Sequence, residues 1–263
     1  MDLGLKNKVA LVTASSKGLG RACAEALARE GARVAICARN GKVLKVAADE
    51  IANATRGEIL AIPADMTNSR DIERVVKETV NHFGSLQILV TNAGGPPPGY
   101  FADLDDRQWQ EAFTLTTLST IRLIRAALPH LKKAEWGRII NITSISVKEP
   151  IDNLVLSNSL RAAVHGLAKT LASQLGHAGI TVNSVMPDYI QTDRLQQVME
   201  QRATQAGQSV EKMMAEFAKS VPVGRIGQPE DLAAVVAFLA SERAGYLTGL
   251  SLPIDGGRSK GTF

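Results

Sequence analysis

An α/β fold with a doubly wound parallel sheet is predicted by three observations. The chain alternates short apolar runs with stretches whose apolar residues recur at spacings of three and four. Seven apolar runs occur, enough for one sheet with helices on both faces. The first run ends in a glycine-rich turn that opens a helical stretch. At 263 residues, 45% of them hydrophobic, the chain is long enough for a large core, and we expect a single domain over 1–263.

Each apolar run is predicted to form one strand of the sheet. Ligands of such sheets bind outside the carboxyl ends of the strands, so the residues after each run are the candidates for a site. The runs are Val9–Val12, Val34–Cys37, Ile59–Ile62, Ile88–Val90, Arg138–Ile142, Thr181–Val185 and Leu250–Ile254.

The turn after the first run has the form that binds a nucleotide pyrophosphate. It leads into a helix predicted from Arg21 to Glu30. Free N–H groups at a helix start point at anionic oxygens, and glycines leave room for their approach. Glycines also close ordinary strand–helix turns, so the surrounding strand and helix give the motif its meaning. The candidate cofactor residues of this turn are Thr13, Ser15, Ser16, Lys17, Gly18, Leu19 and Gly20.

The residues after the second and third runs bear on the adenosine end of a dinucleotide. An acid after the second run would hold the ribose hydroxyls, but the chain has Ala38 and then Arg39. Arg39 and Lys17 suit a 2′-phosphate, so NADP(H) is preferred, with NAD(H) possible; alternatively both are solvated surface charges. Met66 and Asp65 are further cofactor candidates. The Asp65 carboxylate accepts from the adenine amino group, or it caps the helix expected near Ser69.

Composition excludes several classes of function. Cys23 and Cys37 lie in apolar patterns and predict buried thiols, which suits a reducing cytoplasm. No Cys/His spacing suggests a metal, and no apolar run is long enough to span a membrane. The net charge of +4 is spread along the chain, which argues against a nucleic-acid partner. A cytoplasmic location and a small-molecule ligand are therefore expected.

Several ordered motifs follow the later strands: Thr91-Asn92-Ala93-Gly94, Asn141-Ile142-Thr143-Ser144, Pro187-Asp188-Tyr189-Ile190-Gln191-Thr192, Gly227-Gln228-Pro229-Glu230-Asp231 and Ile254-Asp255-Gly256-Gly257. With the first turn, they resemble those of the short-chain dehydrogenase/reductase family, in its branch similar to 3-oxoacyl-acyl-carrier-protein reductases. The resemblance runs from about Leu5 to Gly257. It implies a Rossmann-type fold, hydride transfer between NAD(P)H and a carbonyl or alcohol substrate, and a homotetramer or homodimer. It also implies cofactor contacts from Asn92, Ala93, Gly94, Pro187, Ile190 and Thr192.

The reaction centre departs from the family pattern of a serine, a tyrosine thirteen residues later and a lysine four beyond that. Ser144 matches the serine, whereas Ser157 and Arg161 stand at the other two positions. A serine hydroxyl is far less acidic than a phenol, so the usual proton donor is missing. Arg161 still supplies positive charge and ribose contacts, but it does not readily exchange a proton.

Three further substitutions lie near the expected reaction centre. Ala14 replaces a glycine of the first turn and is tolerated there if its φ stays negative. Thr116 stands where the family has an asparagine that helps to carry a proton-relay water. Asp188 replaces a glycine and puts a carboxylate or a helix cap beside the expected nicotinamide pocket.

Two residues are candidates to compensate for the missing tyrosine. Tyr189 lies in the loop expected to cover the nicotinamide, where it acts as a substitute acid or packs its ring on cofactor or lid. His165 sits one helical turn after Arg161, but it begins an apolar stretch, which favours a packed or capping role.

The segment 193–225 is predicted to form a helical substrate lid. Its apolar residues have helical spacing among charged ones, describing two amphipathic helices. They close over an apolar ligand, or they pack on the sheet or a neighbouring subunit. These residues are Leu195, Met199, Met213, Met214 and Phe217.

The leading hypothesis is an NADP(H)-dependent oxidoreductase in which Ser144 orients the substrate. The proton then comes from water, Ser157 or Tyr189. The alternative is a catalytically silent NADP(H)-binding regulatory or scaffold protein, motivated by the loss of both tyrosine and lysine.

Overall fold

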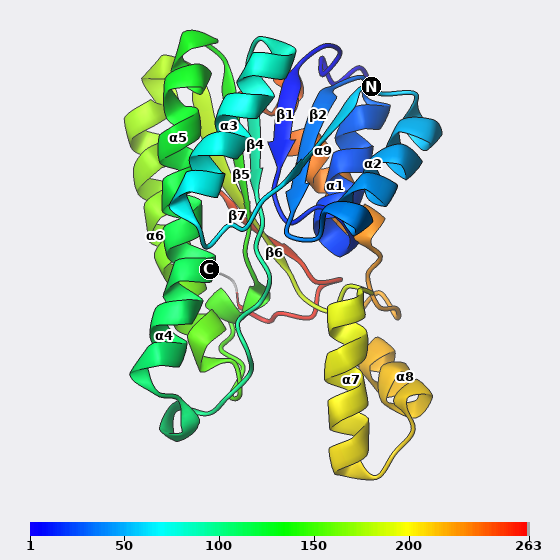
Figure 1. Ribbon diagram of the computed structural model, residues 1–263. Coiled ribbons are helices and arrows are strands. Elements are labelled where there is room, and N and C mark those ends of the chain that lie inside the picture. Colours follow the sequence, from blue (N-terminus) through cyan, green and yellow to red (C-terminus); the bar gives the residue numbers. More distant parts are fainter. Residues whose placement is uncertain (262–263) are drawn as a thin grey trace.

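Seven parallel strands form one central sheet in the order β3-β2-β1-β4-β5-β6-β7 (Figure 1). The computed structural model describes residues 1–261, apart from the side chains at 194, 201 and 205. The order runs outward in both directions from the β1/β4 pair, which confirms the doubly wound, Rossmann-type sheet. The strands are β1 (Val9–Val12), β2 (Arg33–Ala38), β3 (Ile59–Pro63), β4 (Ile88–Thr91), β5 (Gly137–Ile142), β6 (Ile180–Pro187) and β7 (Ser251–Ile254).

All seven predicted strands are confirmed, and the largest difference lies at β6. This strand continues past the predicted end at Val185, because Met186 and Pro187 pair with Pro253 and Ile254 of β7. The extension carries the chain to the carboxyl edge of the sheet, so the residues that follow Pro187 start at the edge where such sheets bind ligands.

Helices cover both faces of the sheet (Figure 1). Alternate strand residues point to opposite faces, so Ala10 and Val12 join one buried cluster while Val9 and Leu11 join the other. The first face is covered by α1 (Gly18–Arg29), α2 (Gly41–Thr55) and α9 (Pro229–Leu239), the second by α3 (Ser69–Phe83), α5 (Ser119–Lys133) and α6 (Val155–Leu175). Short 3₁₀ turns lie at Phe101–Asp103, Ile145–Val147, Gly176–Ala178 and Glu242–Ala244.

Helix α4 (Asp106–Phe113) runs into α5 through a π-helical turn, Thr114–Leu118. Within the turn, Thr116 is buried and its hydroxyl donates to the Ala112 carbonyl, while the Thr117 hydroxyl donates to the Leu160 carbonyl of α6. The Thr116 hydroxyl is therefore used inside its own helix.

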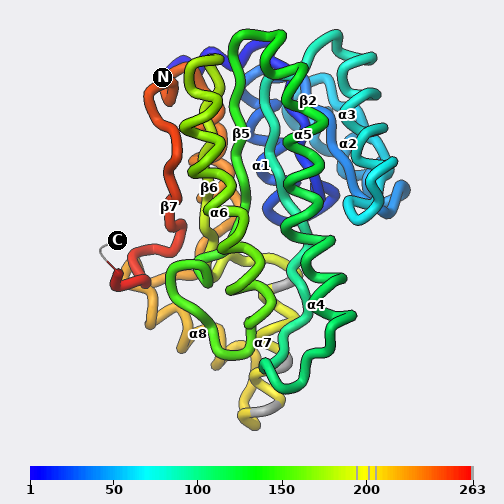
Figure 2. Tube along the Cα trace, turned by 90° about the vertical axis from the view of Figure 1, so that its left-hand side faces the viewer, coloured from blue at the N-terminus to red at the C-terminus, as the bar shows by residue number. Residues whose placement is uncertain are grey.

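Helices α7 (Asp193–Ala206) and α8 (Val210–Ser220) project beyond the carboxyl edge of the sheet, at the same end as α4 (Figures 1 and 2). Thr192 and Ser209 cap their N-termini with side-chain oxygens. Gly207 ends α7 with a φ of 62°, a conformation that glycine adopts without strain. The two amphipathic helices predicted for 193–225 are thus present.

No helix in the described part of the chain is long and apolar enough to cross a lipid bilayer. Within residues 1–261, no cluster of His, Cys, Asp or Glu has the arrangement of a metal site. Cys23 and Cys37 are both buried, as predicted, and burial raises the pKa of the Cys37 thiol to about 12.

Candidate functional site

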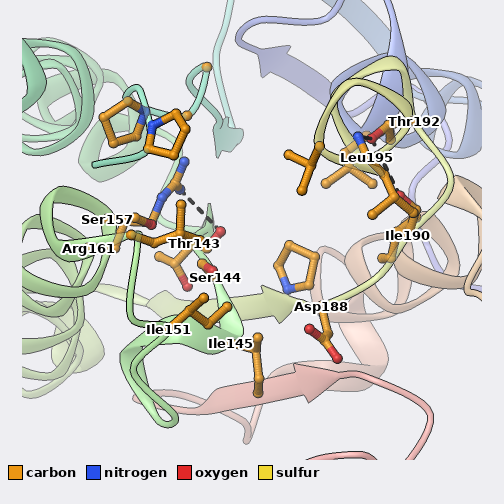
Figure 3. Close-up of a pocket in the computed structure, with 18 of the residues that line it drawn as sticks. Thr143, Ser144, Ile145, Ile151, Ser157, Arg161, Asp188, Ile190, Thr192 and Leu195 are labelled. Atoms are coloured by element: carbon orange, nitrogen blue, oxygen red, sulfur yellow. Dashed lines mark hydrogen bonds between the residues drawn. The ribbon is translucent and has the colours of Figure 1, made fainter. Parts of the chain in front are cut away.

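A cavity of about 600 Å³ lies at the carboxyl edge of the sheet. One wall carries residues of β5, α6 and the turn between them, and the other carries the segment from Asp188 to Leu195 (Figure 3). Its size is that of a ligand pocket. Sequence-predicted residues that line it are Lys17, Gly18, Leu19, Asn92, Ala93, Gly94, Ser144, Ser157, Arg161, Pro187, Tyr189, Ile190 and Thr192.

The glycine turn is tighter than the sequence suggested. Helix α1 begins at Gly18 rather than at the predicted Arg21, so the glycines of the turn form the first turn of the helix. A Cβ on Gly20 would lie 2.4 Å from the Ala14 carbonyl oxygen, so only glycine fits there. Ala14 itself has a φ of +48°, so the negative φ at which alanine would be tolerated there is not present. The Asn92 amide donates to the Ala14 carbonyl and helps to hold this strained residue in place.

Buried hydroxyls brace the turn from behind. The Thr13 hydroxyl donates to the Asn92 carbonyl and accepts the Asn92 N–H, which ties β1 to β4. The Ser15 hydroxyl donates to the Val12 carbonyl and accepts the Cys37 N–H. Thr13 and Ser15 therefore shape the turn, and neither side chain is exposed to the cavity.

Several predicted cofactor residues lie outside this cavity: Thr13, Ser15, Ser16, Gly20, Arg39, Asp65 and Met66. Arg39 is exposed directly after β2, and Met66 is buried in the core beneath α3. One interpretation of the sequence was that Asp65 caps α3, and this interpretation is wrong. Its carboxylate accepts from the Thr67 N–H and hydroxyl, while Asn68 caps the helix.

Lys17 links the turn to the lid. Its Nζ lies 2.6 Å from the Asp193 carboxylate, in the first turn of α7. Both side chains are about two-thirds exposed, so the ion pair adds little stability. It nevertheless joins the glycine turn to the start of α7, a contact between residues 176 positions apart.

Ser144 and Ser157 both face the cavity but do not contact each other. The Ser144 Oγ accepts the Ser146 N–H at 3.2 Å. The Ser157 Oγ lies 3.3 Å from the Ser146 Oγ and is buried. In the described part of the chain the Ser144 hydroxyl has no acceptor, so its proton is available to a ligand.

Arg161 is buried against the end of β5. One Nη donates to the carbonyls of Ile142 and Thr143, at 3.2 and 3.1 Å (Figure 3). These bonds fix the guanidinium on the same wall as Ser144 and Ser157. The three residues therefore place two hydroxyls and one permanent positive charge together.

His165 has the packed role that the apolar stretch favoured. Its Nε2 lies 3.0 Å from the Thr143 hydroxyl and its Nδ1 lies 2.9 Å from the Ser251 hydroxyl, so it bridges β5 and β7. Burial, and to a smaller extent Lys148, lowers the pKa of the imidazole. His165 does not line the cavity.

Asp188 is held by the C-terminal segment. Arg258 donates to both of its carboxylate oxygens, and the Asp188 side chain is only 3% exposed. Burial raises the pKa of Asp188, although the Arg258 contacts oppose this. The neighbouring Tyr189 ring packs edge-on against Phe217, with the Arg258 guanidinium carbon 5.2 Å from its centroid. This geometry favours the packing interpretation of Tyr189.

The cavity-facing side of α7 matches the residues named for the predicted lid only in part. Of the five apolar residues named for the lid, Leu195 lines the cavity, whereas Met199 is fully buried within the lid and Met213, Met214 and Phe217 lie off the cavity. The cavity-facing residues of α7 are Leu195, Val198 and Arg202. Their spacing of three and four is visible in the sequence, but Arg202 is charged and was not predicted there.

The proline-rich loop after β4 was predicted as part of the site only at Gly94. Gly95, Pro96 and Pro98 also line the cavity. The Gly99 N–H donates to the Asn153 carbonyl, and Gly99 pairs with Leu154, which joins this loop to the segment before α6.

The site fits a nicotinamide dinucleotide. A Cβ on Gly94 would meet no atom within 4 Å, and one on Gly18 would meet only the Thr192 side chain, at 3.5 Å, so the backbone is accessible at both positions. The first N–H groups of α1 have no helical acceptors and suit a pyrophosphate. No acid follows β2 to compete with a phosphate.

Comparison with known proteins agrees with this geometry. The profile of a family described as enoyl-(acyl carrier protein) reductase matches residues 13–259. The 3-oxoacyl-[acyl-carrier-protein] reductase FabG of Vibrio cholerae is 35% identical over 257 residues, which cover 97% of this chain and 98% of the relative.

Two solved structures are similar along nearly their whole length. L-sorbose reductase from Gluconobacter frateurii, complexed with NADPH and L-sorbose, has a TM-score of 0.95 and 31% identity, covering 99% of this chain and 100% of the other. A 7α-hydroxysteroid dehydrogenase complexed with NADH has a TM-score of 0.89 and 29% identity, covering 97% and 96%. The chain therefore belongs to the short-chain dehydrogenase/reductase family of NAD(P)-dependent oxidoreductases and is similar to its 3-oxoacyl-acyl-carrier-protein reductases.

Proposed function

We propose that the protein is an NADPH-dependent reductase of a small-molecule carbonyl group, with NADH as a weaker donor. The observation that carries this proposal is that the glycine turn, Ser144 and Arg161 line one cavity. Preference for NADPH is supported by exposed Arg39 after β2 and by the absence of an acid there. The bound nicotinamide supplies the hydride.

The residues of this chain act on the carbonyl oxygen. The Ser144 hydroxyl donates a hydrogen bond to it, and Arg161 stabilises the negative charge that develops as the carbonyl carbon is reduced. A proton must then reach the oxygen. Ser157 is a poor acid and its hydroxyl is occupied by Ser146, and Tyr189 is packed between Phe217 and Arg258, so we assign the proton to water.

The test is a titration of the purified protein with NADPH and NADH, followed by nicotinamide fluorescence, with a panel of ketones, quinones and 3-oxoacyl thioesters added at saturation. Micromolar NADPH binding with oxidation supports the reductase. Loss of the tyrosine acid is expected to slow turnover by roughly 10²–10⁴. The double variant Ser157→Tyr, Arg161→Lys should therefore be faster than the native protein.

A second candidate is a catalytically silent NADP(H)-binding regulatory or scaffold protein. The hydrogen bond between the Ser157 and Ser146 hydroxyls favours it, because the hydroxyl at the donor position is already engaged with a neighbouring side chain. Tight NADPH binding without oxidation of any carbonyl, together with activity that appears only in the double variant, would support this function instead.

The proposed assembly rests on exposed apolar side chains. We infer a homotetramer or homodimer, because Phe101 and Tyr246 are large apolar side chains with 74% and 101% exposure. Light scattering after gel filtration tests this; a monomer at all concentrations contradicts it.

A cytoplasmic location is supported by two free, buried cysteines.

A further inference from the structure

Arg202 is a cation on the cavity side of α7. It follows Leu195 and Val198 on one helix face, and all three line the cavity. With a rise of about 1.5 Å per residue, Arg202 lies roughly 10 Å along α7 from Leu195. Its guanidinium carbon lies 5.3 Å from the centroid of the Phe217 ring of α8, which helps to hold the side chain in place.

The acids that line the cavity are already paired with other cations. Asp193 pairs with Lys17, and Asp188 pairs with Arg258. Among the described residues, no carboxylate forms an ion pair with Arg202. The Arg202 guanidinium is therefore available to an anionic ligand.

Apolar side chains line the same cavity as Arg202 and Ser144. Ile145, Ile151 and Leu154 line the cavity beside Ser144, and Leu195 and Val198 line it from α7. Apolar walls of this kind favour a ligand with a hydrocarbon chain over one with a polar chain. The cavity thus combines polar groups at Ser144 and Arg161, apolar walls and the cation of Arg202.

We infer that Arg202 is a specificity-determining residue and that the substrate is an oxo compound whose apolar chain ends in a carboxylate. The planar guanidinium matches a carboxylate in geometry. This inference rests on the proposed reductase function for the identity of the reacting group, whereas the anion contact at Arg202 is independent of turnover.

The experiment compares methyl-ketone fatty acids of increasing chain length with their methyl esters. Binding to the NADPH-loaded protein is measured by calorimetry, and oxidation of NADPH is followed separately in the same samples. The variants are Arg202→Gln, Arg202→Lys and the matched control Arg70→Gln, which removes an exposed arginine on α3.

At the best chain length, the acid should bind about tenfold more tightly than its ester, the strength of one charged contact that is partly exposed. Arg202→Gln should remove this difference and leave ester binding unchanged, Arg202→Lys should retain part of it, and Arg70→Gln should match the native protein. Equal binding of acid and ester, an acid preference that survives Arg202→Gln, or no binding of any acid would overturn the inference.

The two proposals fail separately in this experiment. An acid preference lost in Arg202→Gln, but without NADPH oxidation, supports the anion site and contradicts the reductase. Oxidation without an acid preference supports the reductase and overturns the role of Arg202.

Discussion

The Arg258 guanidinium forms a doubly hydrogen-bonded ion pair with the Asp188 carboxylate. Arg258 also lies 3.9 Å from Glu149, so one residue after β7 contacts the segments that follow β5 and β6. The pair fixes the start of the loop that carries Tyr189 and Ile190 to the cavity wall. In this chain, a carboxylate at position 188 is tolerated because the C-terminal segment supplies its partner.

Arg258→Ala should destabilise the protein by about 2 kcal/mol at pH 7. Removal of one partner leaves a buried charge, and the value lies below that of a fully buried pair because Arg258 is 23% exposed. Burial alone would then raise the pKa of Asp188 further. A raised folded-state pKa makes the folded protein bind the proton more readily than the unfolded chain, so the loss should shrink as the pH falls toward about 4.

Urea unfolding across this pH range measures the effect. Asp188→Asn combined with Arg258→Ala is the control, since it removes the buried charge and should recover much of the stability. A loss in Arg258→Ala that is independent of pH would contradict the assignment.

Gly20→Ala should weaken NADPH binding more than tenfold and destabilise the protein by roughly 2 kcal/mol, because the new Cβ would lie 2.4 Å from the Ala14 carbonyl oxygen. The matched control is Gly166→Ala within α6, where a Cβ meets nothing within 4 Å. This control should stabilise the protein by about 0.5–1 kcal/mol through helix propensity. Thermal unfolding and fluorescence titration distinguish the two variants, and equal effects would exclude the close approach at Gly20 as the cause.

Ala14→Gly should raise stability by about 0.5–1 kcal/mol. The native φ of +48° is strained for alanine, and the relief exceeds the extra freedom that glycine gains in the unfolded chain. Chemical denaturation measures this change. A loss of stability would mean that the turn accommodates alanine without strain.

The sheet was predicted well because the two patterns that indicate it, the apolar runs and the glycine turn, are local in the sequence. Apolar runs such as Val9–Val12 alternate with helical spacing, and the glycine turn follows directly. The helix-cap interpretation of Asp65 was wrong because its carboxylate bonds to Thr67, and the φ of Ala14, which the sequence left open, is positive at a residue that Asn92 holds.

The site was less accessible from sequence because its decisive contacts join distant residues. Lys17 pairs with Asp193, 176 positions away, and Arg258 pairs with Asp188, 70 positions away. Which face of α7 lines the cavity also depends on how α8 packs against it. An amphipathic pattern identifies the apolar residues of a lid, but not the charged residue that faces the ligand.

Arg39→Asp should shift cofactor preference toward NADH. The substitution places a carboxylate after β2, where it repels a 2′-phosphate and accepts from ribose hydroxyls. The dissociation constant for NADPH should rise at least about tenfold, and that for NADH should fall. Arg56→Asp, the same change of charge at the far end of α2, should leave both constants unchanged. Equal weakening of both cofactors in Arg39→Asp would argue against a phosphate contact.

His165→Asn should flatten the acid side of the stability profile. Burial lowers the pKa of His165, so the unfolded chain, with an imidazole pKa of about 6.5, binds the proton more readily than the folded protein. Stability from this residue is therefore complete above about pH 6.5 and is lost as the pH falls through the folded-state pKa. Urea unfolding between pH about 5 and 8 should show that the native slope is reduced in His165→Asn and retained in His177→Asn, which changes an exposed imidazole. The asparagine also loses part of the bridge between Thr143 and Ser251, so the variant should be less stable at pH 8 as well. A slope equal to that of the native protein would show that His165 carries no proton-linked stability, and that its bridge between β5 and β7 is only a packing contact.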